Sequence, residues 1–84
     1  MIRPRAVAVS AIDDYKLHVT FDNGECRIFD AAPLIKGSYF GQLHDTNYFS
    51  QVAIGGLSIE WPHGQDVCPD DLYYNSVPVK NKSK

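Results

Sequence analysis

Hydrophobic and polar residues alternate strictly from Tyr15 to Phe21, where Lys16, His18 and Thr20 separate aromatic and aliphatic side chains. A period of two is typical of a β-strand that buries one face, because successive side chains point to opposite sides. The pattern therefore predicts a strand over these residues, with His18 on its solvent face. The apolar run Ala6–Ile12 precedes it across an Asp-Asp pair, so we expect a first strand there and a turn between the two.

A tight turn is predicted after the second strand. An Asn-Gly pair at residues 23–24 stands between two β-favouring runs, and this pair favours a type I′ hairpin turn. The run Cys26–Phe29 is then the returning strand, with Cys26 and Ile28 on one face. Phe29 breaks the alternation, which predicts that the strand ends or twists at that residue.

Short helices are expected in the middle of the chain. Asp30 is placed to cap a helical turn that follows it, an interpretation that we favour over a catalytic carboxylate. Apolar residues three and four apart within residues 38–43 indicate a second, amphipathic turn. Asp45 or Thr46 is expected to cap a third turn over residues 47–50.

A second hairpin and a final helix are predicted from the remaining pattern. Residues 51–54 and 57–61 carry apolar side chains on either side of a Gly-Gly pair, which is typical of a hairpin. Proline ends the second of these strands, because it cannot donate to a ladder, and opens a Pro-His-Gly turn at residues 62–64. Residues 68–72 combine a proline with two acids, which favours the start of a helix.

The order of these elements predicts the α+β class, with an antiparallel β-meander and a second hairpin and short helices between them. We expect residues 1–77 to form a single domain and residues 78–84 a basic, disordered C-terminal tail. A chain of 84 residues buries only about 60–65% of its unfolded surface, so packing against a second copy or a partner would help to stabilise it.

Charge is distributed unevenly along the chain. The net charge is −2, but three of the eight basic residues lie in the tail, so residues 1–77 hold five basic residues against all ten acidic ones. An acidic body repels phosphate backbones, which disfavours direct binding of nucleic acid. The lysines of the tail are expected to be solvated.

Cellular location follows from what the sequence lacks. The chain opens without a cationic and apolar leader, and no apolar run approaches the roughly 18 residues of a membrane span. Cys26 and Cys68 have neither the spacing of a redox pair nor, together with the histidines, that of a zinc site. We therefore predict a cytoplasmic protein with no membrane association, no cofactor and no metal; whether the two cysteines meet stays open.

Residues 57–72 hold the side chains with the most functional potential, which are Trp61, His63 and Asp66. In one interpretation Trp61 anchors the small core and Asp66 accepts backbone hydrogen bonds in a turn. In the other, these three residues, together with Asp30, line a recognition surface, because Trp is enriched at binding hot spots and turns often carry function.

Two functions are compatible with these residues. The first is a non-enzymatic interaction module that binds a protein partner or itself. The acidic body and the small core favour it, as do five Tyr and one Trp, whose side chains give a large contact area with few torsions to freeze. The alternative is a small-ligand-binding or metal-dependent enzyme that uses Asp30, His63 and Asp66, which must then converge in a pocket.

An enzyme is the less favoured of the two. No nucleophile stands beside a base at a recognised spacing, and Cys68 lacks a basic neighbour that would lower its pKa. The Gly-Gly pair opens no helix, so it does not form a phosphate-binding loop. We predict no catalytic residues.

With these segments in place, the chain resembles a family of small bacterial proteins known as domain of unknown function 2442. The Trp-Pro-x-Gly-x-Asp segment that begins at Trp61 is the most specific part, and relatives commonly carry Asn where this chain has His63. The resemblance runs from about Val7 to Tyr73. The matching residues are 15–25, 29–30, 33–34, 40, 43, 49, 52, 59–67, 69–70 and 72–73.

The resemblance implies an α+β fold with a β-meander and short helices, and it brings no established catalytic residues. It also implies a partner, because similar proteins are often encoded beside a second small uncharacterised protein. The resemblance therefore suggests either a toxin–antitoxin-like pairing or a regulatory domain. Some larger relatives add a helix-turn-helix domain. The ten residues after Tyr74 are too few for such a domain, so we expect this chain to lack the part that would contact DNA.

Overall fold

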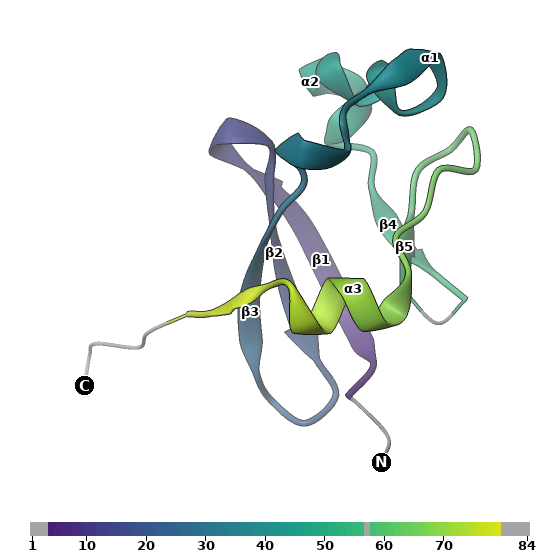
Figure 1. The fold of residues 1–84 in the computed structure, drawn as a ribbon. Helices are drawn as coiled ribbons and strands as arrows, with labels where there is room; N and C mark the ends of the chain where they lie inside the picture. The colour runs from purple at the N-terminus through teal and green to yellow at the C-terminus, as the bar shows by residue number, and fades with distance from the viewer. Residues whose placement is uncertain (1–3, 57, 80–84) are drawn as a thin grey trace.

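The computed structural model describes residues 4–56 and 58–79, and it shows an antiparallel meander extended by a short C-terminal strand (Figure 1). The strand order is β1-β2-β3-β6, and every neighbouring pair is antiparallel. The predicted meander is therefore confirmed. Its strands are β1 (Ala6–Ile12), β2 (Lys16–Phe21), β3 (Cys26–Asp30) and β6 (Val77–Pro78).

A two-stranded hairpin and short helices complete the α+β fold, as predicted. The hairpin joins β4 (Ala53–Gly55) to β5 (Ser58–Glu60); Leu57, expected in its second strand, lies outside the described residues. None of the helices in the described part of the chain has the length and apolar character to span a membrane. The α-helices are α1 (Gly37–Phe40), α2 (Thr46–Phe49) and α3 (Pro69–Tyr74), and 3₁₀ turns cover Asp13–Tyr15, Ala32–Leu34 and Gly41–His44.

One hydrophobic core lies on a single face of the four-stranded sheet. Leu17, Val19 and Phe21 point from β2 into this core, as their alternation predicts. Side chains from the helices and from β5 meet them there, including Leu72 and Ile59. In Figure 1, α3 crosses in front of the sheet and the short helices close its upper end.

The turn between β2 and β3 differs from the predicted type I′ turn. The Gly24 amide donates to the Phe21 carbonyl over 3.0 Å, and the Phe21 amide donates to the Glu25 carbonyl over 2.8 Å. Only Gly24 has a positive φ, of 92°, whereas a type I′ turn needs positive φ at both central residues. The prediction failed because the loop is longer than two residues. It forms a type I turn followed by a glycine bulge.

The same arrangement recurs at the predicted turn over residues 62–64. The Gly64 amide donates to the Trp61 carbonyl over 2.9 Å, the Trp61 amide donates to the Gln65 carbonyl over 2.8 Å, and Gly64 has a φ of 97°. After this turn, Asp66 pairs with Glu60 in an isolated antiparallel β-bridge.

Strand β3 is longer than predicted. It does not end at Phe29 but continues to Asp30, and Phe29 faces the core opposite Leu17. Cys26 and Ile28 do share a face, as predicted, but it is the face turned away from the core. The alternation was obscured because the first inward position of the strand is a charged residue, Arg27.

The end of the folded body also lies further along the chain than predicted. Val77 and Pro78 form β6 against β3, and the Val79 amide donates to the Cys26 carbonyl over 2.9 Å. Pro78, assigned to a disordered tail from the sequence, is thus part of the sheet. Residues 80–84 lie outside the described part of the chain.

Candidate interaction surface

The face of the sheet turned away from the core carries no helix in the described structure, and we call it the outer face. Its positions follow from the strand register, in which directly opposed residues point to the same side. None of them is buried. The outer face consists of Ala8, Ser10, Ile12, Lys16, His18, Thr20, Cys26, Ile28, Asp30, Val77 and Val79.

Apolar side chains are concentrated on the β3–β6 side of the outer face. Val77 is 64% exposed and Val79 41%, and the half-buried Ile28 and Cys26 lie beside them on β3. Neighbouring strands are about 4.8 Å apart, so these four side chains form one patch. Ile12, 42% exposed on β1, is separated from the patch by the polar outer positions of β2. Contiguous exposed apolar surface of this kind is a mark of interaction sites.

Charge distinguishes the outer face from the rest of the molecule. The described residues include four basic and all ten acidic residues, and nine of the acids are exposed. The outer face holds one acid and one base, Asp30 and Lys16, which lie directly opposite each other on β3 and β2. It is therefore electrically neutral in a strongly acidic body.

Both cysteines are free, which answers the question that the sequence left open. Cys26 lies on the outer face, with its Sγ 3.8 Å from the Thr20 Oγ1. Cys68 is exposed at the start of α3. The two thiols thus report on different parts of the surface.

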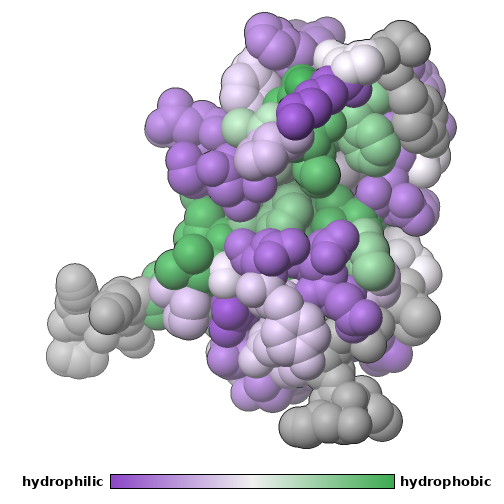
Figure 2. All heavy atoms as spheres, in the orientation of Figure 1, coloured by the Kyte–Doolittle hydropathy of each residue, from purple (hydrophilic) through white to green (hydrophobic). Residues whose placement is uncertain are grey.

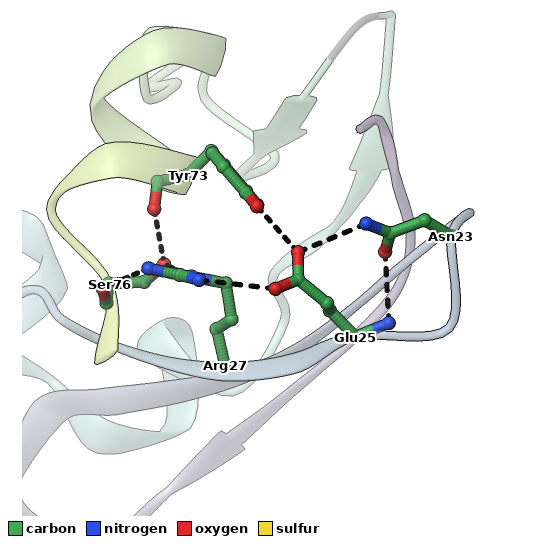
Figure 3. A network of polar contacts seen from close by, with 5 residues as sticks. All are labelled: Asn23, Glu25, Arg27, Tyr73 and Ser76. Atoms are coloured by element: carbon green, nitrogen blue, oxygen red, sulfur yellow. Dashed lines mark hydrogen bonds and ion pairs between the residues drawn. The ribbon is translucent and has the colours of Figure 1, made fainter. Parts of the chain in front are cut away.

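A network of polar side chains attaches the end of α3 and the start of β6 to the β2–β3 hairpin (Figure 3). We call it the clasp, and it consists of Asn23, Glu25, Arg27, Tyr73 and Ser76. The Arg27 Nε donates to the Ser76 Oγ over 2.7 Å, and its Nη2 donates to the Ser76 carbonyl over 2.8 Å. The guanidinium also lies 4.5 Å from the centre of the Tyr73 ring. These contacts hold β6 at the edge of the sheet.

Glu25 is the acceptor at the centre of the clasp. The Tyr73 hydroxyl donates to its Oε1 over 2.6 Å, the Asn23 Nδ2 donates to the same oxygen over 3.1 Å, and Arg27 lies 3.5 Å from Oε2. The Tyr73 bond, followed by the Asn23 bond, lowers the pKa of Glu25 from its ordinary value of 4.5. The same bond raises the pKa of Tyr73 above 10.0, since the carboxylate stabilises the protonated phenol.

Sequence reasoning missed the clasp. Its two halves are 48 and 49 residues apart, so no local sequence pattern connects them. The one available signal was Arg27, a charged residue between Cys26 and Ile28 in a strand. An inward-facing arginine needs partners for its donors, and Ser76 and Tyr73 supply them.

The Pro-His-Gly turn is joined to the short helices by a second polar cluster. The Tyr48 hydroxyl donates to the Oε1 of the fully buried Gln65 over 2.6 Å and accepts the His63 amide over 2.8 Å. The His63 Nδ1 is hydrogen-bonded to the Gln42 Oε1, and the Tyr48 and His63 rings lie 5.0 Å apart. These bonds fix the turn against α2 and the preceding 3₁₀ turn.

Trp61 lies in the core and not on the surface. It is 2% exposed, and its Nε1 donates to the Phe49 carbonyl over 2.8 Å. This agrees with the interpretation that Trp61 anchors the core. The candidate recognition surface that included Trp61 is corrected accordingly, because the ring has almost no area left for a partner.

The other three residues singled out from the sequence are exposed, but they lie on different elements. Asp30 ends β3 on the outer face, and its Oδ1 accepts the Ala32 amide over 3.0 Å. The N-cap of the following 3₁₀ turn is Ala31, and not Asp30 as the sequence predicted, because the strand continues through Asp30. His63 belongs to the turn after β5, and Asp66 lies opposite Glu60. Among the described residues, no group of three or more His, Cys, Asp or Glu is placed to hold a metal ion.

A pocket of about 260 Å³ lies at the turn between β1 and β2. Asp14 and Tyr15 in this turn have positive φ angles of 62° and 60°, which are unusual for residues other than glycine. The residues that line the pocket do not include Asp30, His63 or Asp66, the residues of the predicted enzyme site. They are Ala11, Ile12, Asp13, Asp14, Tyr15, Thr46, Phe49 and Ser50.

Comparison with known protein families identifies the chain. A family model described as "Protein of unknown function (DUF2442)" matches residues 6–78. The chain belongs to the DUF2442 family. The suspected resemblance is thereby confirmed. No curated protein and no solved structure matches the chain.

The DUF2442 match covers the whole four-stranded sheet. It begins at Ala6, the first residue of β1, and ends at Pro78, the last residue of β6. The resemblance recognised from the sequence stopped at Tyr73. The family match therefore includes β6 and all but one of the positions of the outer face, the exception being Val79.

Proposed function

We propose that this DUF2442 domain is a non-enzymatic interaction module that binds another protein through the outer face of its four-stranded sheet. The observation that carries the proposal is the exposure of a half-apolar and neutral surface across four strands. Protein interfaces are depleted of charged residues at their centre, as this surface is. Figure 2 views the molecule from the opposite side, that of α3, and shows there a band of hydrophobic residues flanked by hydrophilic ones above and below.

The clasp supports the same proposal, because it fixes the part of the outer face that comes last in the chain. Val77 and Val79 reach the outer face only because β6 is paired with β3. Arg27, Tyr73 and Ser76 hold that strand in place before any partner arrives. A surface that is formed in advance loses less conformational entropy on binding.

The cytoplasm is the proposed place of action, and a protein is the proposed partner. Free thiols at Cys26 and Cys68 support a reducing compartment. Two partners are considered: the product of the neighbouring gene, which the family resemblance suggested, and a second copy of this chain. The acidic body supports neither nucleic acid nor an anionic membrane as the partner.

The proposal is tested by comparing complex formation by two matched variants. Val77→Lys places a charge on the outer face, where Val77 is 64% exposed. Tyr74→Lys places the same charge three residues earlier on α3, at a nearly equal exposure of 63%. Complex formation, alone and with the product of the neighbouring gene, is measured by sedimentation. We expect Val77→Lys to weaken binding at least about tenfold, since burying an unpaired ammonium costs well over 1.4 kcal/mol.

Tyr74→Lys controls for the effect of added charge, and it should leave binding within about twofold of wild type. Equal binding by wild type and Val77→Lys would remove the outer face from the interface. A chain that forms no complex in either experiment would contradict the proposed function itself.

A further inference from the structure

We propose that the occupant of the outer face is a second copy of this chain, so that two sheets pack face to face as a two-fold symmetric dimer. This inference rests on the proposed function and names its partner. It follows from the charge, the shape and the size of the outer face.

The distribution of charge favours a second copy. Two molecules that each carry an excess of acids repel each other through most of their surfaces, because eight of the nine exposed acids lie away from the outer face, on the turns, the helices and β5. The outer face does not contribute to this repulsion, because the charges of Lys16 and Asp30 cancel on it. Two-fold packing brings the same patch together from both copies, so Lys16 of each copy can approach Asp30 of the other.

The side chains of the outer face also suit packing of one sheet on another. Two sheets that pack face to face lie about 10 Å apart, and their side chains interdigitate. None of the eleven outer positions holds Phe, Tyr or Trp, although the chain contains ten such residues. The apolar positions are Ala, Val, Ile and Cys, and the polar ones include Ser10 and Thr20. Such side chains make a flat and shallow surface that a copy of itself can match.

The size of the surface sets the expected strength. A standard protein–protein interface uses about 20–30 residues on each side, and the outer face offers eleven positions. We therefore expect a reversible dimer with a dissociation constant in the micromolar range or above, which forms at high protein concentration and dissociates on dilution.

The two free cysteines provide a test on the unaltered protein. Cys26 lies within the proposed interface and Cys68 lies outside it, exposed at the start of α3. The rate of alkylation by iodoacetamide is measured at each thiol, by mass spectrometry, over a series of protein concentrations. If the dimer protects Cys26, its rate falls in proportion to the remaining monomer, by about tenfold where nine-tenths of the chains are paired. The rate at Cys68 should stay constant.

Each outcome decides the proposal. Slower alkylation at Cys26 alone, abolished by Val77→Lys and retained by Tyr74→Lys, supports the dimer. Rates at Cys26 that do not change with concentration, or that fall equally at both thiols, overturn it. In those cases the proposed function is judged separately: if Val77→Lys still prevents a complex with the product of the neighbouring gene, the outer face binds a different protein and only the second copy is excluded.

Discussion

Glu25 shows how a single side chain contributes to the architecture of this small domain. It accepts hydrogen bonds from Tyr73 and Asn23 and lies within 3.5 Å of Arg27, so one carboxylate connects the hairpin to α3. These contacts, the Tyr73 bond first, lower the pKa of Glu25. Because the carboxylate form is the one that is bound, the contacts stabilise the fold only while Glu25 is ionised.

The first prediction concerns the pH dependence of stability. The contribution of Glu25 is present above pH 4.5 and is lost as the pH falls through its lowered folded-state pKa. The contribution of Tyr73 has the opposite sense: it is present below pH 10.0 and is lost as the pH rises through its raised pKa. We expect the free energy of unfolding of Tyr73→Phe to fall less steeply than that of wild type at both acid and alkaline pH, as measured by urea unfolding between pH 2 and pH 11. Identical profiles for wild type and variant would contradict the role of this bond.

The second prediction concerns Gly24, whose φ of 92° is strained for any residue with a Cβ. Gly24→Ala meets no atom within 4 Å, so its effect is purely conformational, and we expect a loss of about 1–2 kcal/mol. Gly41 is the matched control: it also has free space, but its φ of −59° suits alanine, so Gly41→Ala should be neutral or stabilise by up to about 1 kcal/mol. Chemical denaturation measures both, and equal effects would show that the turn imposes no positive φ.

At the scale of elements, the position of β6 depends on the clasp more than on its own ladder. The strand is only two residues long, and its described pairing with β3 is brief. Arg27 contributes two bonds to Ser76, and the Ser76 hydroxyl donates in turn to the Tyr73 carbonyl over 2.8 Å. The element therefore stays in place through side chains of its neighbours.

The third prediction follows from this dependence. Ser76→Ala removes the acceptor of the Arg27 Nε, and we expect β6 to open more readily by about 1 kcal/mol. The Val79 amide, which donates to the Cys26 carbonyl, should then exchange its hydrogen about fivefold faster. The Val19 amide in the central strand serves as the internal control. Exchange at Val79 that is as slow as in wild type would show that β6 is held without Ser76.

The elements themselves could be predicted from the sequence, because their signals are local. The strand predicted from the alternation of residues 15–21, the Gly-Gly hairpin and the helix that starts at a proline each depend on a few adjacent residues. Each was confirmed, except that β2 begins at Lys16 and Tyr15 belongs to the preceding 3₁₀ turn. Asp45 likewise caps α2 by accepting the Asn47 amide, as expected.

The candidate site was much harder to predict, since it depends on contacts between distant residues. The inward position of Arg27 makes sense only with Ser76 beside it, and without that contact the sequence predicted that β3 ends or twists at Phe29. Without that register, the outer face could not be recognised as a surface. Trp61 is the only Trp in the chain, and the sequence does not show whether it lies in the core or on the surface. Its burial depends on packing against Phe49 and β5.

At the scale of the whole molecule, a small core makes Trp61 a determinant of stability and not of recognition. The fourth prediction is that Trp61→Phe leaves the Phe49 carbonyl without its donor and a void beside it, at a cost of about 2–3 kcal/mol. That is a large share of the roughly 5–15 kcal/mol typical of a domain. Thermal unfolding measures the loss. The folded variant should assemble as wild type does. Weaker assembly by a fully folded variant would show that Trp61 also contributes to binding.

The central claim is that the outer face is where this domain meets its partner. The most direct measurement is the amide nitrogen–proton NMR spectrum, recorded over a series of protein concentrations and with the product of the neighbouring gene added. We predict that shifts concentrate on β1, β2, β3 and β6 around His18, Ile28 and Val77, while the turn around His63 and Asp66 keeps its positions. Shifts confined to that turn, with the four strands unchanged, would contradict the account.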